Sequence, residues 1–110
     1  MAHALDAERL SIRRQLGDRP GIVESLEGLA RDLCALGSPA RAARTWGAAE
    51  RLRDEVGVPM SPAARTDYLT RVAVARAAIA DATAFDRAWQ EGRSLALELA
   101  IVDALQPVGG

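Results

Sequence analysis

Few residues in this chain are of the types that perform catalysis. His3 is its single histidine and Cys34 its single cysteine, and neither stands among carboxylates at the spacing of a metal site. A nucleophilic thiol needs a histidine beside it, and the sequence lacks lysine, which the common phosphate-binding loop of nucleotide-hydrolysing proteins requires. We therefore expect no catalytic residue, no metal and no cofactor, with Cys34 as a small, buried or half-buried helix residue.

The residues best suited to binding share one face of a predicted helix. Glu24, Glu27, Arg31 and Cys34 follow an i, i+3, i+7, i+10 spacing, which aligns them along an α-helix. Two interpretations remain open. This is either a binding surface or a solvated face on which Glu27 and Arg31 form an ion pair worth roughly a few tenths of a kcal/mol. Arginines that would extend a binding surface are Arg65, Arg71 and Arg76.

Composition limits the classes of partner. The 110 residues carry 14 arginines and 15 acidic residues, a net charge of -1, so the chain lacks the basic excess that drives nucleic-acid binding. Its uncharged runs are only a few residues long, against the roughly 20 that a membrane helix needs. Charged residues near the start interrupt any secretory signal. We expect a cytoplasmic domain that contacts neither membrane nor nucleic acid.

Local signals divide the chain into helices. The sequence is rich in alanine and leucine and has no stretch of alternating apolar and polar residues, which predicts an all-α fold. Glycines that follow apolar-periodic runs mark three helix ends, at Gly17, Gly37 and Gly57. Capping residues mark helix starts at Ser38-Pro39, Ser61-Pro62, Asp81 and Ser94, the last two more weakly. The six expected helices span residues 2–16, 20–36, 39–56, 62–80, 82–92 and 95–105.

The second and third of these helices carry a repeat-like spacing. The positions concerned are Leu26, Leu29, Ala30, Leu33, Gly37, Ala42, Trp46 and Ala49. Small residues in this set let two helix axes approach closely, and Leu33 and Trp46 fill the space between them. This spacing resembles that of tetratricopeptide (TPR) repeats. The resemblance implies a superhelix of antiparallel helix hairpins, here closed by a short C-terminal bundle, in which the face carrying Glu24, Glu27, Arg31 and Cys34 lines a concave groove.

A second set of residues extends over nearly the whole chain. It comprises Leu16-Gly17-Asp18-Arg19, Gly21-Ile22, Glu27-Gly28-Leu29-Ala30, Ala42-Ala43, Gly47-Ala48-Ala49-Glu50, Leu52-Arg53, Phe85, Ala88-Trp89, Glu91-Gly92-Arg93 and Leu95. With these residues the chain resembles the C-terminal helical segment of LuxR-type and other ATP-dependent, STAND-like bacterial transcriptional regulators. The resemblance implies that residues 1–110 form a single helical domain, as a piece of a larger regulator, at its interaction or sensing end.

Several residues are expected to mediate helix packing or self-association. Gly28, Gly47 and Gly92 interrupt helices, at a cost of roughly 1 kcal/mol each relative to alanine. Close helix crossing, or a ligand that approaches the backbone, would offset that cost. Phe85 and Trp89 should pack the fifth helix against the fourth. The last helix is apolar on most sides, so it either lies within the terminal bundle or offers one face to another chain. That face would comprise Leu97, Ile101 and Leu105.

Two hypotheses of function follow, and an autonomous enzyme is the least favoured reading. The first is a non-catalytic protein–protein interaction domain of a bacterial transcriptional regulator, with a protein partner or a second copy of the chain, as in a homodimer, on its surface. The second is a sensing domain whose groove binds a small-molecule effector and switches a parent ATPase module. A melting temperature raised by a metabolite would favour the second hypothesis.

Overall fold

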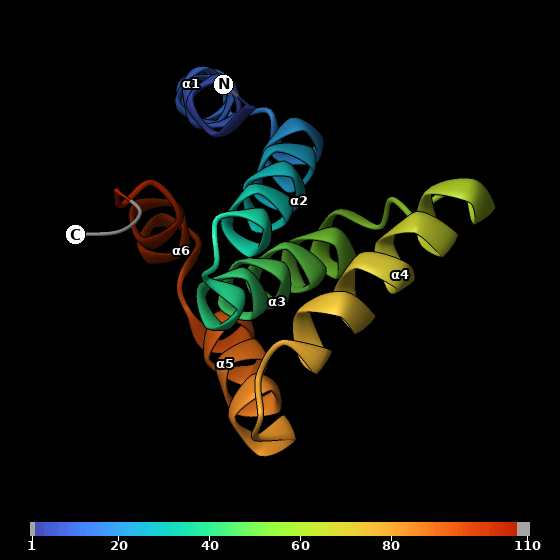
Figure 1. The fold of residues 1–110 in the computed structure, drawn as a ribbon. Helices are drawn as coiled ribbons and strands as arrows, with labels where there is room; N and C mark the ends of the chain where they lie inside the picture. Colours follow the sequence, from blue (N-terminus) through green and yellow to red (C-terminus); the bar gives the residue numbers. More distant parts are fainter. Residues whose placement is uncertain (1, 108–110) are drawn as a thin grey trace.

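The computed structural model describes residues 2–107 and is all-helical over that range (Figure 1). Six helices follow one another: α1 (Ala2–Leu16), α2 (Arg19–Ala35), α3 (Pro39–Val56), α4 (Pro62–Ala77), α5 (Ala82–Ser94) and α6 (Leu97–Ala104). The all-α fold and the number of helices predicted from the sequence are confirmed for these residues. The two clearest differences are at the end of α4, which stops short of residue 80, and at the start of α6, which begins after residue 95.

The glycine signals are confirmed. Gly17, Gly37 and Gly57 have φ values of 68°, 86° and 77°, the left-handed region that side chains with a Cβ disfavour. Ser61 and Asp81 also cap as expected, because their side-chain oxygens accept hydrogen bonds from the backbone N–H groups of the following turns. Helix ends in this chain are therefore set largely by residues next to them.

Two capping assignments need correction. Ser38 stands at the N-cap position of α3, but within residues 2–107 its side chain makes no capping hydrogen bond. Ser94 does not cap α6: it is the last residue of α5, and its hydroxyl donates to the carbonyl of Gln90. Ala96 occupies the capping position before α6 and has no side chain that could cap. Asp18, for its part, caps α2 by accepting a 3.0 Å hydrogen bond from the N–H of Gly21.

The core has two clusters that meet along α3. The first joins α1, α2, α3 and α6 and contains Leu10, Ile22, Val23, Leu26, Leu29, Ala49, Leu52, Ile101 and Ala104. The second joins α2, α3, α4 and α5 and contains Ala30, Leu33, Ala42, Ala43, Trp46, Ala75, Phe85 and Ala88. All the repeat-like positions other than Gly37 are buried in one cluster or the other.

Helices α3 and α5 cross with their backbones in contact. A Cβ atom on Gly47 would collide with the carbonyl oxygen of Trp89, and one on Gly92 with the carbonyl oxygen of Arg44. Gly28 sits against the carboxylate of Asp6 on α1, 3.1 Å from where a Cβ would stand. The close helix crossing expected at these glycines is therefore observed, and it is tightest between α3 and α5.

Helix α6 folds back onto the body of the molecule. Ile101 is fully buried in the first core cluster, and Leu97 and Leu105 pack partly buried against it. The alternative in which these three residues form a free interface is therefore corrected: their side chains face the chain's own core. The exposed apolar residues of α6 are Leu99 and Val102.

Two arginines of α3 form hydrogen bonds with α6 and with the residues that follow it. Arg44 binds Asp103 through two hydrogen bonds of 2.8 and 2.9 Å. Arg41 donates to the backbone carbonyls of Asp103, Gln106 and Pro107. Bidentate, charge-assisted contacts of this kind are among the stronger polar interactions in proteins.

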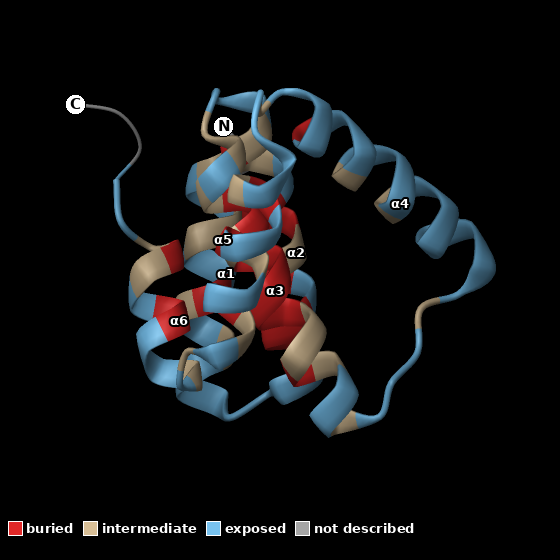
Figure 2. Cartoon of the chain, turned by 90° about the horizontal axis from the view of Figure 1, so that it is seen from below, coloured by how far each residue is buried: buried red, intermediate tan, exposed pale blue. Residues whose placement is uncertain are grey.

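Helix α4 is the exception to this packing. Ala75 is its one buried residue, and Figure 2 shows the helix exposed along most of its length and set off from the others. It contacts the second core cluster through Tyr68, Val72 and Ala75, with Ile79 just beyond its end. Phe85 and Trp89 of α5 belong to the same cluster, as expected, and the guanidinium of Arg76 lies 4.5 Å from the centre of the Phe85 ring. Within residues 2–107, no helix combines the length and apolarity of a membrane crossing.

Candidate functional site

A cavity of about 320 Å³ lies between α4 and the α2–α3 hairpin. We call it the α2–α4 groove. Its walls are formed by residues of α2 and α4, while α3 and the segment from residue 58 to 61 contribute the rest of the lining. The residues that line it are Glu24, Glu27, Arg31, Trp46, Arg53, Val58, Pro59, Met60, Ser61, Ala64, Asp67, Tyr68 and Arg71.

The groove brings together three of the four binding residues that the sequence suggested. Glu24, Glu27 and Arg31 line it from one face of α2. Cys34, one turn further on, does not line it and packs half-buried against the second core cluster. Among the arginines considered as extensions, Arg71 lines the groove, whereas Arg65 and Arg76 lie beside other hollows along α4.

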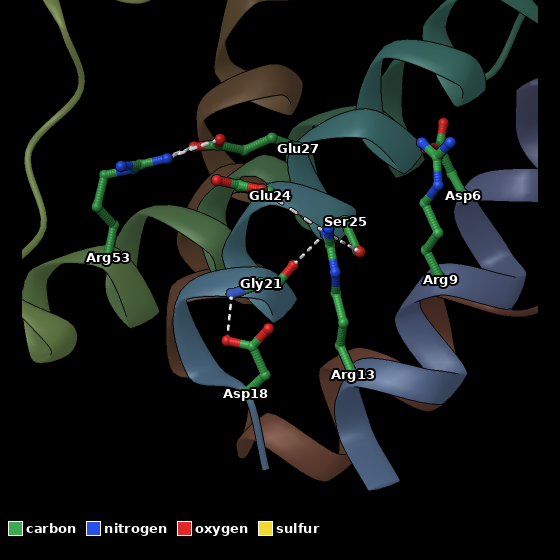
Figure 3. A network of polar contacts seen from close by, with 9 residues as sticks. All are labelled: Asp6, Arg9, Arg13, Asp18, Gly21, Glu24, Ser25, Glu27 and Arg53. Atoms are coloured by element: carbon green, nitrogen blue, oxygen red, sulfur yellow. Dashed lines mark hydrogen bonds and ion pairs between the residues drawn. The ribbon is translucent and has the colours of Figure 1, made fainter. Parts of the chain in front are cut away.

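Glu27 forms a strong contact across the helix hairpin. It accepts hydrogen bonds from both Nε and Nη2 of Arg53, the shortest 2.8 Å, and both side chains are about four-fifths buried (Figure 3). The same guanidinium donates to the carbonyl of Val58 at 2.8 Å. The Glu27–Arg31 pair of the solvated-face interpretation is absent from the described residues, and Glu27 instead forms a bidentate pair with Arg53 of α3.

Glu24 is held only loosely. Its carboxylate lies 3.7 Å from Arg13 of α1, and its side chain is 69% exposed. Arg13 makes shorter contacts with the carbonyl of Gly21 and the hydroxyl of Ser25, at 2.9 and 3.0 Å (Figure 3). Because the Arg13 guanidinium donates mainly to Gly21 and Ser25, the Glu24 carboxylate keeps most of its capacity to accept hydrogen bonds from another molecule.

The two arginines of the groove differ in their surroundings. Arg71 forms an ion pair of 2.9 Å with Asp67, one turn earlier on α4, and both side chains are about half exposed. Arg31 is exposed and, among the residues that the structure describes, has neither an ion pair nor a hydrogen bond. Arg31 is thus the cation of this groove that has no ion-pair partner within residues 2–107.

Aromatic rings form the junction between the groove and the second core cluster. Tyr68 meets Trp46 edge to face at a centroid distance of 6.4 Å, and Trp89 stacks on Trp46 at 6.3 Å. Burial, followed by the charges of Glu50 and Glu27, raises the pKa of Tyr68 above its usual value. The phenol therefore stays protonated at neutral pH and can donate a hydrogen bond to a group bound in the groove.

A second group of acids lies away from the groove, between α1 and α2. The pKa of Asp32 is raised to about 7, first by burial and then by the neighbouring Asp6, while the charge of Arg31 acts in the opposite direction. Oδ2 of Asp32 and Nδ1 of His3 are buried without a hydrogen-bond partner in the described part of the chain. No trio of His, Cys, Asp or Glu side chains within residues 2–107 is arranged to hold a metal ion.

Several groove residues were not anticipated from the sequence. Arg53, Tyr68 and the segment 58–61 became apparent only when α3 and α4 were placed in space. One signal was present, since Tyr68, Val72, Ala75 and Ile79 follow an i, i+4, i+7, i+11 spacing that marks the inner face of α4.

Comparison of the chain with known protein families, curated proteins and solved structures found no match.

Proposed function

We propose that this chain is a non-catalytic protein-interaction domain, and that the α2–α4 groove binds a segment of a partner protein. The hairpins α2–α3 and α4–α5 would stack in the manner of a TPR superhelix, with α2 and α4 on its concave side. The resemblance to the C-terminal segments of LuxR-type regulators makes transcriptional regulation the process in which we place the parent protein.

The observation that carries this proposal is the series of hollows along α4. Besides the α2–α4 groove, a hollow of about 520 Å³ is lined by the second half of α3 and the start of α4. Another hollow, of about 340 Å³, lies between α4 and α5. Tyr68 lines all three. Three adjoining hollows with apolar and charged linings suit a peptide segment, whose side chains can occupy neighbouring sites.

A small-molecule effector is the second candidate function. The volume of the α2–α4 groove, about 320 Å³, falls at the lower end of the range that small ligands occupy, roughly 300 to 1,000 Å³. Its lining combines the apolar Met60 and Trp46 with a few polar groups, as such sites do. Under this hypothesis a metabolite, and no peptide, would raise the melting temperature of the domain.

Peptide selection on the purified domain tests the proposal. Ala64 lines the groove, so Ala64→Trp should fill it. The exposed Ala73 lies two and a half turns further along α4 and therefore on the opposite side of the helix, so Ala73→Trp serves as the matched control. We expect random short peptides selected on the unaltered domain to bind the Ala73→Trp variant equally and the Ala64→Trp variant at least about tenfold more weakly. The proposal would be contradicted if the selected peptides bound the Ala64→Trp variant as tightly as the unaltered domain, or if no peptide could be selected.

A further inference from the structure

Some of the charged residues that line the α2–α4 groove have close ion-pair partners, and others do not. Glu27 and Arg53 neutralise each other across the α2–α3 hairpin, and Asp67 and Arg71 do so within α4. Two charged residues of the lining remain, Glu24 and Arg31, which lie two turns apart on one face of α2. Arg31 forms no ion pair within residues 2–107, and Glu24 shares an exposed, 3.7 Å contact with Arg13.

Asp32 is only a partial counter-charge for Arg31, and no ion pair joins the two within the described residues. It follows Arg31 in the sequence, but burial and the neighbouring Asp6 raise its pKa to about 7, which reduces its negative charge at neutral pH. Asp6 itself contacts Arg9 at 3.8 Å on α1. Arg31 forms neither an ion pair nor a hydrogen bond with these acids within residues 2–107, and it lines the groove.

The distance between Glu24 and Arg31 along α2 sets the spacing of the charges that a partner would need. Glu24 and Arg31 are seven residues apart, or two helical turns, which separates them by about 10 Å along the axis of α2. Apolar lining lies across from α2, where Met60, Pro59 and the ring of Tyr68 face the same cavity. The groove therefore presents an acceptor, an apolar surface and a guanidinium.

From this arrangement, and resting on the proposed function, we infer that the partner segment is dipolar: an acidic side chain pairs with Arg31, a basic side chain pairs with Glu24, and an apolar side chain contacts Tyr68 and Met60. The two charged residues of the partner would stand about three positions apart in an extended segment, or about seven apart on a helix, since both spacings cover about 10 Å.

The charge pattern favours a carboxylate over a phosphate at Arg31. Phosphorylated motifs are bound by clusters of arginines, which concentrate positive charge on a dianion. Here a single unpaired guanidinium shares its face of α2 with the carboxylates of Glu24 and Glu27, which would repel a dianion more strongly than a singly charged side chain. The carboxylate of an aspartate or glutamate also matches the bidentate geometry that one guanidinium offers.

Charge reversal in the groove tests the inference. The same random-peptide selection is run on the unaltered domain, on Arg31→Glu, on Glu24→Arg, and on the double variant. Arg87→Glu is the matched control, because Arg87 is an exposed arginine of α5 that lines none of the three hollows along α4. Circular dichroism and melting temperature verify that each variant folds, and Arg31→Gln and Glu24→Gln replace any reversal that does not.

We expect the unaltered domain and the Arg87→Glu variant to enrich peptides with acidic and basic residues at the stated spacing. Arg31→Glu should abolish the acidic preference, Glu24→Arg the basic one, and the double variant should select the reverse order of charges. A selected peptide should lose about tenfold in affinity when its acidic residue becomes an amide, and Arg31→Gln should add little to that loss.

The outcomes separate the inference from the proposed function. Suppose that the selected peptides bind more weakly to Ala64→Trp but show no charge pattern, or bind Arg31→Gln as tightly as the unaltered domain. This result would overturn the inference and leave the proposed function standing. Selection of no groove-dependent peptide would overturn both.

Discussion

Helices α4 and α5 belong to one hairpin and yet relate to the rest of the molecule in opposite ways. Helix α5 buries Phe85, Ala88 and Gly92 and touches the backbone of α3, whereas α4 buries Ala75 alone. The difference follows from the size of the side chains at each contact. Small residues let two axes approach until backbones meet, while Tyr68 and Val72 hold α4 at a distance. A helix of the first kind becomes part of the core, and one of the second kind becomes the wall of a groove.

The difference in packing should also appear in stability. A helix with few buried contacts opens at a lower free energy than one fixed in the core, because local stability follows the contacts that are lost on opening. Binding sites are commonly built from such elements. Variants that remove a contact from α5 or from α4 therefore measure how unequal the two helices are.

The largest effect is expected for Phe85→Ala. The ring is fully buried in the second core cluster, so its removal should lower the free energy of unfolding by about 3–5 kcal/mol. The matched variant Leu69→Ala removes a half-exposed side chain of α4 and should change stability by less than about 0.5 kcal/mol. Urea unfolding followed by circular dichroism measures both. Comparable losses in the two variants would show that α4 is packed as firmly as α5.

A smaller loss is expected for Gly92→Ala. Alanine is intrinsically the better helix former by about 1 kcal/mol, but its Cβ would collide with the carbonyl of Arg44, and forced separation of packed helices costs about 1–3 kcal/mol. Gly28→Ala is the control, since its Cβ would meet the movable carboxylate of Asp6. We expect a lower melting temperature for Gly92→Ala than for Gly28→Ala. A Gly92→Ala variant as stable as the unaltered chain would mean that α3 and α5 do not touch as described.

The smallest effect concerns the pH dependence contributed by the α1–α2 contact. The pKa of Asp32 is about 7 in the folded chain, against an ordinary value of 3.8, so the folded state holds a proton that the unfolded state releases between those values. Stability contributed by this group should therefore fall as the pH rises from about 4 to about 7. Since Asp32 is only partly buried, solvent screening limits the effect to the order of 1 kcal/mol.

Asp32→Asn should remove that contribution, because an amide does not titrate in this range. Unfolding free energies measured from about pH 5 to pH 8 should show the variant gaining on the unaltered chain as the pH rises. Asp67→Asn, which changes an exposed acid of α4, should leave the slope nearly unchanged. Parallel pH profiles for the unaltered chain and Asp32→Asn would refute a raised pKa at Asp32.

The parts of the fold that were predictable from the sequence depend on local signals. A left-handed glycine or a capping side chain acts within a few residues, so the ends at Gly17 and Gly57 and the cap at Ser61 could be identified without knowledge of the rest. The start of α6 was misplaced because Ala96 offers no such signal. The orientation of α6 stayed open for a related reason, since a helix that is apolar on most sides does not reveal which side is inward.

The candidate site was only partly predictable. Glu24, Glu27 and Arg31 share a face because helix periodicity alone dictates it, and that much was evident from their spacing. The ion pair was assigned to the wrong arginine, since Arg53 lies 26 positions from Glu27 and reaches it only through the α2–α3 hairpin. Long-range contacts of this kind depend on how helices pack, which periodicity does not specify.

Many of the inter-helix polar contacts described above end on an arginine, and some of these arginines donate to backbone carbonyls at or just beyond the end of a neighbouring helix. Arg41 does this beyond α6, and Arg51 does it at the end of α5, where it donates to the carbonyls of Arg93 and Leu95. A planar guanidinium carries five N–H groups, whereas an ammonium is a compact and strongly hydrated charge. Recoding all 14 arginines as lysine would preserve the net charge of -1. It would also leave these carbonyls short of donors, so two chains with identical charge would differ in how durably their helix ends are joined.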